Sequence, residues 1–117
     1  CTNEALFALA STIYMAVMGK QGLRQIAELC YHKSHYAANQ INALPGYSLP
    51  ISDPFFQEFV VQCPDSPAKI NKKLMELNIL GGLDVNEKIP NGMLLCVTEM
   101  NSKEDIDALV AALAEFK

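Results

Sequence analysis

The most restrictive feature of this chain is its first helix, because residues 3–18 read NEALFALASTIYMAVM. The stretch has only four polar side chains, those of Asn3, Glu4, Ser11 and Thr12, so the helix is apolar on nearly all sides. Such a helix must be enclosed by protein or lipid. Because it falls short of the roughly 20 residues needed to span a bilayer, we expect it to pack inside a larger protein body.

The chain begins at Cys1 without an initiator Met, and we therefore expect these 117 residues to be one domain of a longer protein whose remainder covers the first helix. Half of the residues are hydrophobic and 19% are charged, which is typical of a globular domain and not of a disordered or membrane-spanning chain. Thirteen carboxylates outnumber nine scattered Lys and Arg residues, so the sequence predicts no nucleic-acid partner.

The four cysteines lie about thirty residues apart and form no C-x-x-C pair, so we interpret them as reduced thiols: Cys1, Cys30, Cys63 and Cys96. Cys30 and Cys96 have apolar neighbours, and we expect both in the core. With no hydrophobic leader segment and no membrane-spanning run, the sequence predicts a cytoplasmic protein that does not enter a membrane.

Two helices are predicted in the first part of the chain. Thr2 is placed to cap the first helix and Gly19 to end it. After a link over residues 20–22, a second helix is predicted to run to about Leu44. Its core face would carry Leu23, Ile26, Cys30, Ala37, Ile41 and Leu44.

The second part of the chain changes from helical to mixed periodicity. After a loop over residues 47–54, residues 55–62 predict a strand, and Ser66-Pro67 predicts the start of a helix that Gly81-Gly82 ends. Residues 83–85 predict a short strand and residues 93–98 a buried central strand, followed by a helix with a capping box at Ser102. This order predicts an α+β fold in which helices cover a small sheet.

Few residues point to chemistry. Glu28, His32 and His35 share one helical face and suggest a metal site, although a solvated polar stripe explains the same letters better. Cys63, beside Pro64, suggests an exposed thiol but has no predicted base. The lysines lie in turns or on polar faces, unlike a Schiff-base lysine. From the residues alone we predict no catalytic, cofactor-binding or metal-binding residue.

Five blocks of sequence resemble a known family in order and approximate spacing. They read CTNEALFALASTIYMAVMGKQGLRQIAE, PFFQEFVV, ILGGL, LLCVTE and EDIDALVAAL. They are similar to the C-terminal end of subunit 1 of the two-subunit glycine dehydrogenase (decarboxylating), the P protein of the glycine cleavage system. The resemblance implies the small C-terminal domain of a fold type I pyridoxal-phosphate enzyme, with a mostly antiparallel sheet of about three strands. Residues 1–46 would lead from a large domain and residues 47–117 would form the small domain, together one structural unit.

The resemblance also implies a function. The family decarboxylates glycine and passes the aminomethyl group to the lipoyl arm of the H protein. A carbanion formed by decarboxylation needs an electron sink, which pyridoxal phosphate supplies. In this family the Schiff-base lysine belongs to subunit 2, so we expect the cofactor there and a noncatalytic role here. Cys1, Thr2 and Asn3 are the residues we expect near a subunit or domain interface, and the loop over residues 84–93 is shorter than the family leads us to expect.

A second interpretation is a ferredoxin-like regulatory domain that binds a small ligand. The order of strands and helices after residue 55 suits that function as well. The first helix separates the two interpretations, because a regulatory module has little use for a helix that is apolar all round.

Overall fold

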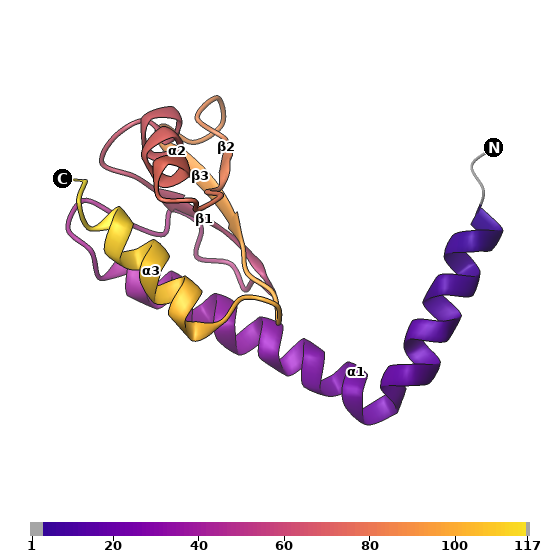
Figure 1. The fold of residues 1–117 in the computed structure, drawn as a ribbon. Helices are drawn as coiled ribbons and strands as arrows, with labels where there is room; N and C mark the ends of the chain where they lie inside the picture. Colours follow the sequence, from indigo (N-terminus) through magenta and orange to yellow (C-terminus); the bar gives the residue numbers. More distant parts are fainter. Residues whose placement is uncertain (1–3, 117) are drawn as a thin grey trace.

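The computed structural model describes residues 4–116, and it begins with the long helix α1, Glu4–Asn42. Gly19 divides this helix, because its φ of 61° and ψ of −179° are not helical. That region of backbone space is essentially restricted to glycine. The predicted break at Gly19 is therefore confirmed, and Figure 1 shows a sharp bend in α1. The predicted cap at Thr2 lies outside the described residues.

The rest of the chain forms a three-stranded antiparallel sheet with two further helices. The strands are β1, Glu58–Gln62, β2, Leu83–Asp84, and β3, Gly92–Cys96, in the order β1-β3-β2. Helix α2, Pro67–Glu76, lies between β1 and β2 in the sequence, and α3, Lys103–Leu113, ends the fold. The predicted α+β class, the small antiparallel sheet and the central position of the apolar strand are confirmed.

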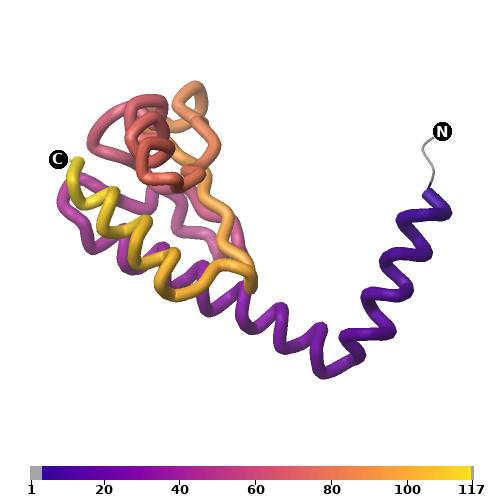
Figure 2. Tube along the Cα trace, viewed as in Figure 1, coloured from indigo at the N-terminus to yellow at the C-terminus, as the bar shows by residue number. Residues whose placement is uncertain are grey.

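Alternate residues of β1 and β3 form the covered face of the sheet. Phe59, Val61, Met93 and Leu95 are buried, as the period of two in a half-covered strand requires. They join buried side chains of all three helices, namely Ala37, Ala38, Ile41, Ile70, Leu74, Ile106, Ala112 and Leu113. Helix α3 runs beside the second half of α1 under this face (Figures 1 and 2).

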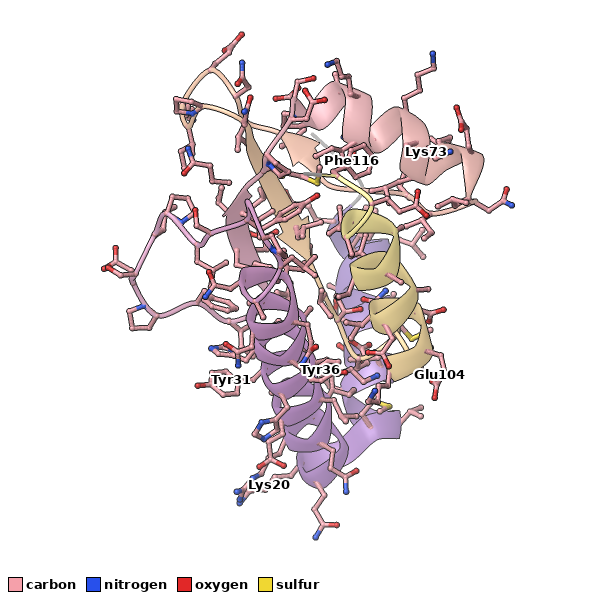
Figure 3. The ribbon with its side chains drawn as sticks, turned by 90° about the vertical axis from the view of Figure 1, so that its left-hand side faces the viewer. Lys20, Tyr31, Tyr36, Lys73, Glu104 and Phe116 are labelled. Carbon is pink, nitrogen blue, oxygen red and sulfur yellow. The ribbon has the colours of Figure 1, made fainter. Side chains whose placement is uncertain are left out.

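Polar contacts fix the second half of α1 against the later elements. The ammonium group of Lys33 donates to the backbone oxygens of Glu99 and Asn101, at 2.6 and 2.5 Å. The buried hydroxyl of Ser34 donates to the backbone oxygen of Phe56 at 2.6 Å. In Figure 3, Tyr36 lies between α1 and α3, and its hydroxyl donates to the Asp107 carboxylate at 2.6 Å.

The boundaries of two helices differ from the prediction. Residues 20–22 are helical, so the second half of α1 starts directly after Gly19, and it ends at Asn42 and not at Leu44. Helix α2 ends at Glu76, well before Gly81, because Asn78 adopts the left-handed conformation with a φ of 59°. Asparagine is one of the residues that tolerate this conformation just after a helix.

Two cysteines and one leucine also lie in environments other than those predicted. Cys96 is exposed and Cys63 is 3% exposed, the reverse of the expectation for both. Cys63 continues the buried alternation of Phe59 and Val61, whereas Cys96 stands on the opposite face of β3. Leu23 is 37% exposed, because the buried stripe of α1 begins only at Cys30.

Candidate docking surface

The N-terminal half of α1, residues 4–18, is an extended and exposed apolar surface, and we call it the arm. All of its residues through Val17 are exposed. Its large apolar side chains are Leu6, Phe7, Leu9, Ile13, Tyr14, Met15 and Val17, with Phe7 71% and Val17 77% exposed. An apolar surface of this extent marks an interaction site. No helix in residues 4–116 is long and apolar enough to cross a membrane.

The bend and the anchoring of α1 together place the arm. Residues 30–41 are held against the sheet and α3, and the turn at Gly19 then directs the arm away from that packed body (Figure 2). The arm therefore stands clear of the core formed by the rest of the described chain (Figure 1). The exposed apolar side chains of the arm favour packing against another apolar surface.

The sheet has a second, smaller apolar surface on its open face. Val60, Leu94 and Leu83 stand side by side across the three strands, and Leu83 is 65% exposed. Next to this row, a groove of about 710 Å³ follows the outer edge of β3 between residues 78–83 and α3. This face was not predicted, because MLLCVT reads as a continuous apolar run. The polar residue Glu58 was the one sequence signal for an open face, because it pairs with Cys96 and lies on the same side of the sheet.

The predicted metal ligands do not come together. The Glu28 carboxylate accepts a hydrogen bond from the Arg24 guanidinium at 2.7 Å, on the exposed side of α1. The His35 ring stacks on Phe55 with centroids 4.1 Å apart, and its Nδ1 lies 2.8 Å from the backbone oxygen of Tyr31. Among residues 4–116, no three His, Cys, Asp or Glu side chains gather where they would hold a metal ion.

The candidate nucleophile Cys63 is also in the wrong environment for reaction. Burial raises the pKa of its thiol to about 11, so the thiol stays protonated at neutral pH. A second buried thiol, Cys30, donates to the Glu99 carboxylate at 3.3 Å, and burial is the main reason that its pKa is raised. Neither cysteine is available as a thiolate nucleophile at neutral pH.

The described lysines are not placed to form a Schiff base. All of them are exposed except Lys33, whose side-chain nitrogen donates to two backbone oxygens. A Schiff-base lysine needs an apolar setting that favours its neutral form. Cys1, Thr2 and Asn3, the residues expected near an interface, lie outside the described residues.

The fold defines the class of protein. The chain superposes on the cystine C-S lyase C-DES, solved with glycine linked to its PLP cofactor, with a TM-score of 0.68 and 22% identity over 80% of this chain and 24% of that one. It superposes equally well on a phosphoserine aminotransferase from Cytophaga hutchinsonii, with a TM-score of 0.67 and 20% identity over 89% of this chain and 29% of that one. The fold is thus that of the small C-terminal domain of fold type I pyridoxal-phosphate enzymes.

Closer relatives identify the family. The model of the glycine cleavage system P-protein family matches residues 1–113, so the chain belongs to this family. A probable glycine dehydrogenase (decarboxylating) subunit 1 from Thermomicrobium roseum is 51% identical over 98% of this chain and 26% of its own length. A protein of the same name from Desulfitobacterium hafniense is 48% identical over the whole of this chain and 27% of its length.

A solved structure agrees with the sequence relatives. The crystal structure of an inhibitor-bound glycine decarboxylase (P-protein) of the glycine cleavage system superposes with a TM-score of 0.90 and 33% identity, over 98% of this chain and 26% of that one. The family resemblance predicted from the five sequence blocks is confirmed. The chain spans about a quarter of the length of the curated relatives that it matches.

Proposed function

We propose that the chain is the C-terminal part of subunit 1 of a two-subunit glycine dehydrogenase (decarboxylating). The whole enzyme would decarboxylate glycine and transfer the aminomethyl group to the lipoyl arm of an H protein in the cytoplasm. The names of the relatives support this activity. The bare apolar arm carries the structural part of the proposal, because it requires a large neighbouring body and the relatives are almost four times as long as this chain.

The role of these residues in the enzyme is structural and not catalytic. Pyridoxal phosphate, when bound, would supply the electron sink for the carbanion left by decarboxylation. The described lysines do not fit a Schiff base with it, since six are exposed and the side-chain nitrogen of Lys33 is engaged by two backbone oxygens. We therefore place the cofactor on subunit 2, and this chain would complete the assembly by docking its arm on the large domain.

The unpaired thiols are consistent with the proposed compartment. Cys30, Cys63 and Cys96 are all free. Proteins of reducing compartments keep their cysteines in this state. The ferredoxin-like regulatory alternative has no comparable support, because the relatives are glycine dehydrogenase subunits and the arm has no role in a self-contained ligand-binding module.

Reconstitution tests the proposal. Full-length subunit 1 should restore glycine-dependent carbon dioxide exchange to a matching subunit 2 that is inactive alone. The variant Phe7→Asp, on the arm, should abolish the gain, because a carboxylate cannot be buried unpaired against an apolar surface. The matched control is Met75→Asp on α2, which is 60% exposed and should preserve the gain. Wild-type subunit 1 that brings no gain in exchange rejects the assignment.

A further inference from the structure

The outer edge of β3 has a backbone position without a partner. The Val97 amide donates to the Gln57 backbone oxygen at 2.9 Å, on the side of β1. Hydrogen bonding alternates along an antiparallel strand, so the amide and carbonyl of Cys96 point away from β1. On that outer side β2 pairs with β3 only at Met93 and Leu94, and within residues 4–116 no backbone hydrogen bond reaches the amide or carbonyl of Cys96.

The chain just before β2 lies against α2. The side-chain amide of Asn71, on α2, donates to the backbone oxygen of Gly82 at 2.8 Å. A Cβ atom at Gly81 would stand 2.1 Å from the Asn71 side-chain oxygen, so the backbone there lies tightly against α2. In the register of β2, Gly81 would have faced Cys96. Gly81 lies against α2 instead, and no backbone hydrogen bond joins it to Cys96.

The groove beside this edge is bounded by apolar side chains. It runs along β3 from Leu94 to Val97 and has a volume of about 710 Å³. Leu80, on its rim, is 85% exposed, and Leu109 of α3 lines the opposite side. An open strand edge is a template for another extended backbone. Adding a strand there would pair the Cys96 backbone and cover Leu80 in one step.

We propose that an extended segment of the full-length subunit, from the part of the chain outside these 117 residues, pairs with β3 at Cys96 and continues the sheet beyond the end of β2. The open edge offers a single outward-facing residue, so a separate peptide would lose more freedom on binding than its few hydrogen bonds return. A segment of the same chain has a high effective concentration and avoids most of that cost. The relatives carry about three quarters of their length outside the matched region. The inference rests on the proposed function only in assuming this longer chain.

Amide hydrogen exchange of full-length subunit 1 tests the inference. The Cys96 amide should exchange as slowly as the Leu94 amide, which faces the same edge and whose residue pairs with Leu83. If Cys96 exchanges a hundredfold faster than Leu94, the inference is wrong. Protection that appears only after subunit 2 is added assigns the edge to the partner, and protection that rises with protein concentration assigns it to a second copy. Both results also overturn the proposal.

A pair of variants separates strand pairing from general burial. In the full-length subunit, Leu80→Ser should speed exchange of the Cys96 amide at least tenfold, because the added strand loses its apolar cover. The control Met100→Ser, at a residue that is 81% exposed and outside the groove, should leave it unchanged. Equal effects of the two variants would contradict the proposal. Exchange is measured without glycine turnover, so this result and the carbon dioxide exchange assay can fail independently.

Discussion

The two halves of α1 belong to one helix and yet have opposite environments. The arm, residues 4–18, is apolar on nearly every side and is exposed. The second half is less apolar, but Cys30, Ala37 and Ile41 are buried along one stripe. The difference shows that the hydrophobicity of a helix does not reveal whether its own chain covers it. A helix with one apolar stripe packs that stripe against its own domain. A helix that is apolar on all sides must be enclosed all round, which a domain of this size does not provide.

Polar contacts follow the same division. The second half of α1 is held to residues far along the chain by Lys33, Ser34 and Tyr36. In the arm, the one side-chain hydrogen bond among the described residues joins the Thr12 hydroxyl to the Ala8 backbone oxygen, within the helix itself. The arm therefore offers a partner mainly apolar contacts. Burying one of its large side chains completely would contribute about 1.5–3 kcal/mol of free energy.

Removing a large apolar side chain from the arm should have the largest effect on stability, and only in the full-length subunit. Phe7→Ala should cost full-length subunit 1 about 3–5 kcal/mol of unfolding free energy, as the loss of a buried Phe does. In the 117-residue chain, where Phe7 is 71% exposed, it should cost almost nothing. Urea unfolding of both proteins measures the difference.

The reference for this comparison is Ile41→Ala, at a fully buried position in the second half of α1. It should cost about 2–5 kcal/mol in both proteins, because its cover lies within the described chain. If Phe7→Ala were equally harmless in the full-length subunit, the arm would have no covering body, and the proposed docking would be wrong.

The buried core that the second half of α1 packs against should make stability depend on pH through Cys63. Burial raises the pKa of the Cys63 thiol from 9.0 to about 11, so the folded state holds the proton more tightly than the unfolded state does. This stabilisation is complete below pH 9 and is lost as the pH rises toward 11, at about 1.4 kcal/mol per unit of pKa shift. Unfolding free energies of the full-length subunit between pH 8 and 11 should fall by about 2 kcal/mol more in the wild type than in Cys63→Ala. Equal slopes would show that the thiol is not buried.

Periodicity in the sequence predicted the order of elements, and Gly19 and Ser102 marked two helix boundaries correctly. The side of each strand was harder to assign. FFQEFVVQC places Phe59, Val61 and Cys63 on one face, but the prediction treated Cys63 as the end of the strand and therefore as exposed. In MLLCVT the alternation of buried and open positions cannot be read from the letters, because Leu94, on the open face, is as apolar as its buried neighbours.

Contacts between distant residues could not be read from the sequence. The Lys33 ammonium group reaches backbone oxygens at Glu99 and Asn101, 66 and 68 residues away. Backbone oxygens are present at every residue and give no sequence signal. The contact between α2 and the chain before β2 is of the same kind, since the Asn71 side-chain amide donates to the Gly82 backbone oxygen, 11 residues away.

Gly19 lies at the bend between the two halves of α1, and its backbone conformation should matter for stability. Gly19→Ala should destabilise the full-length subunit by about 1–3 kcal/mol, because a φ of 61° with a ψ of −179° is strained for any residue with a Cβ atom. A Cβ atom there would meet nothing within 4 Å, so the cost is conformational and not steric. Thermal unfolding of the full-length subunit measures it.

The matched control for this joint is Gly22→Ala, in the helical part just after the bend. Its added methyl group would contact Met18, and the change should lie between neutral and a gain of about 1 kcal/mol from better helix propensity. If Gly19→Ala behaved like Gly22→Ala, the bend would not be needed, and a straight α1 would serve the assembly equally well.

The smallest effect concerns the start of α3. The Ser102 hydroxyl accepts from the Asp105 amide at 3.0 Å, and the Asp105 carboxylate accepts from the Ser102 amide at 2.9 Å, which confirms the predicted capping box. Ser102→Ala should cost about 1 kcal/mol by thermal unfolding, the usual value of an N-cap. The Ser102 hydroxyl also donates to the Asp105 carboxylate at 2.6 Å, and this bond, together with that from the Ser102 amide, lowers the pKa of Asp105. The contribution of the carboxylate is therefore present above the unfolded pKa and is lost on acidification. The cap lies beside the Asn101 backbone oxygen that binds Lys33, within the packed body of the described chain. The loss of stability from Ser102→Ala should therefore be equal in the 117-residue chain and in the full-length subunit, unlike the loss from Phe7→Ala. A larger loss in the full-length subunit would mean that the covering body also contacts α3.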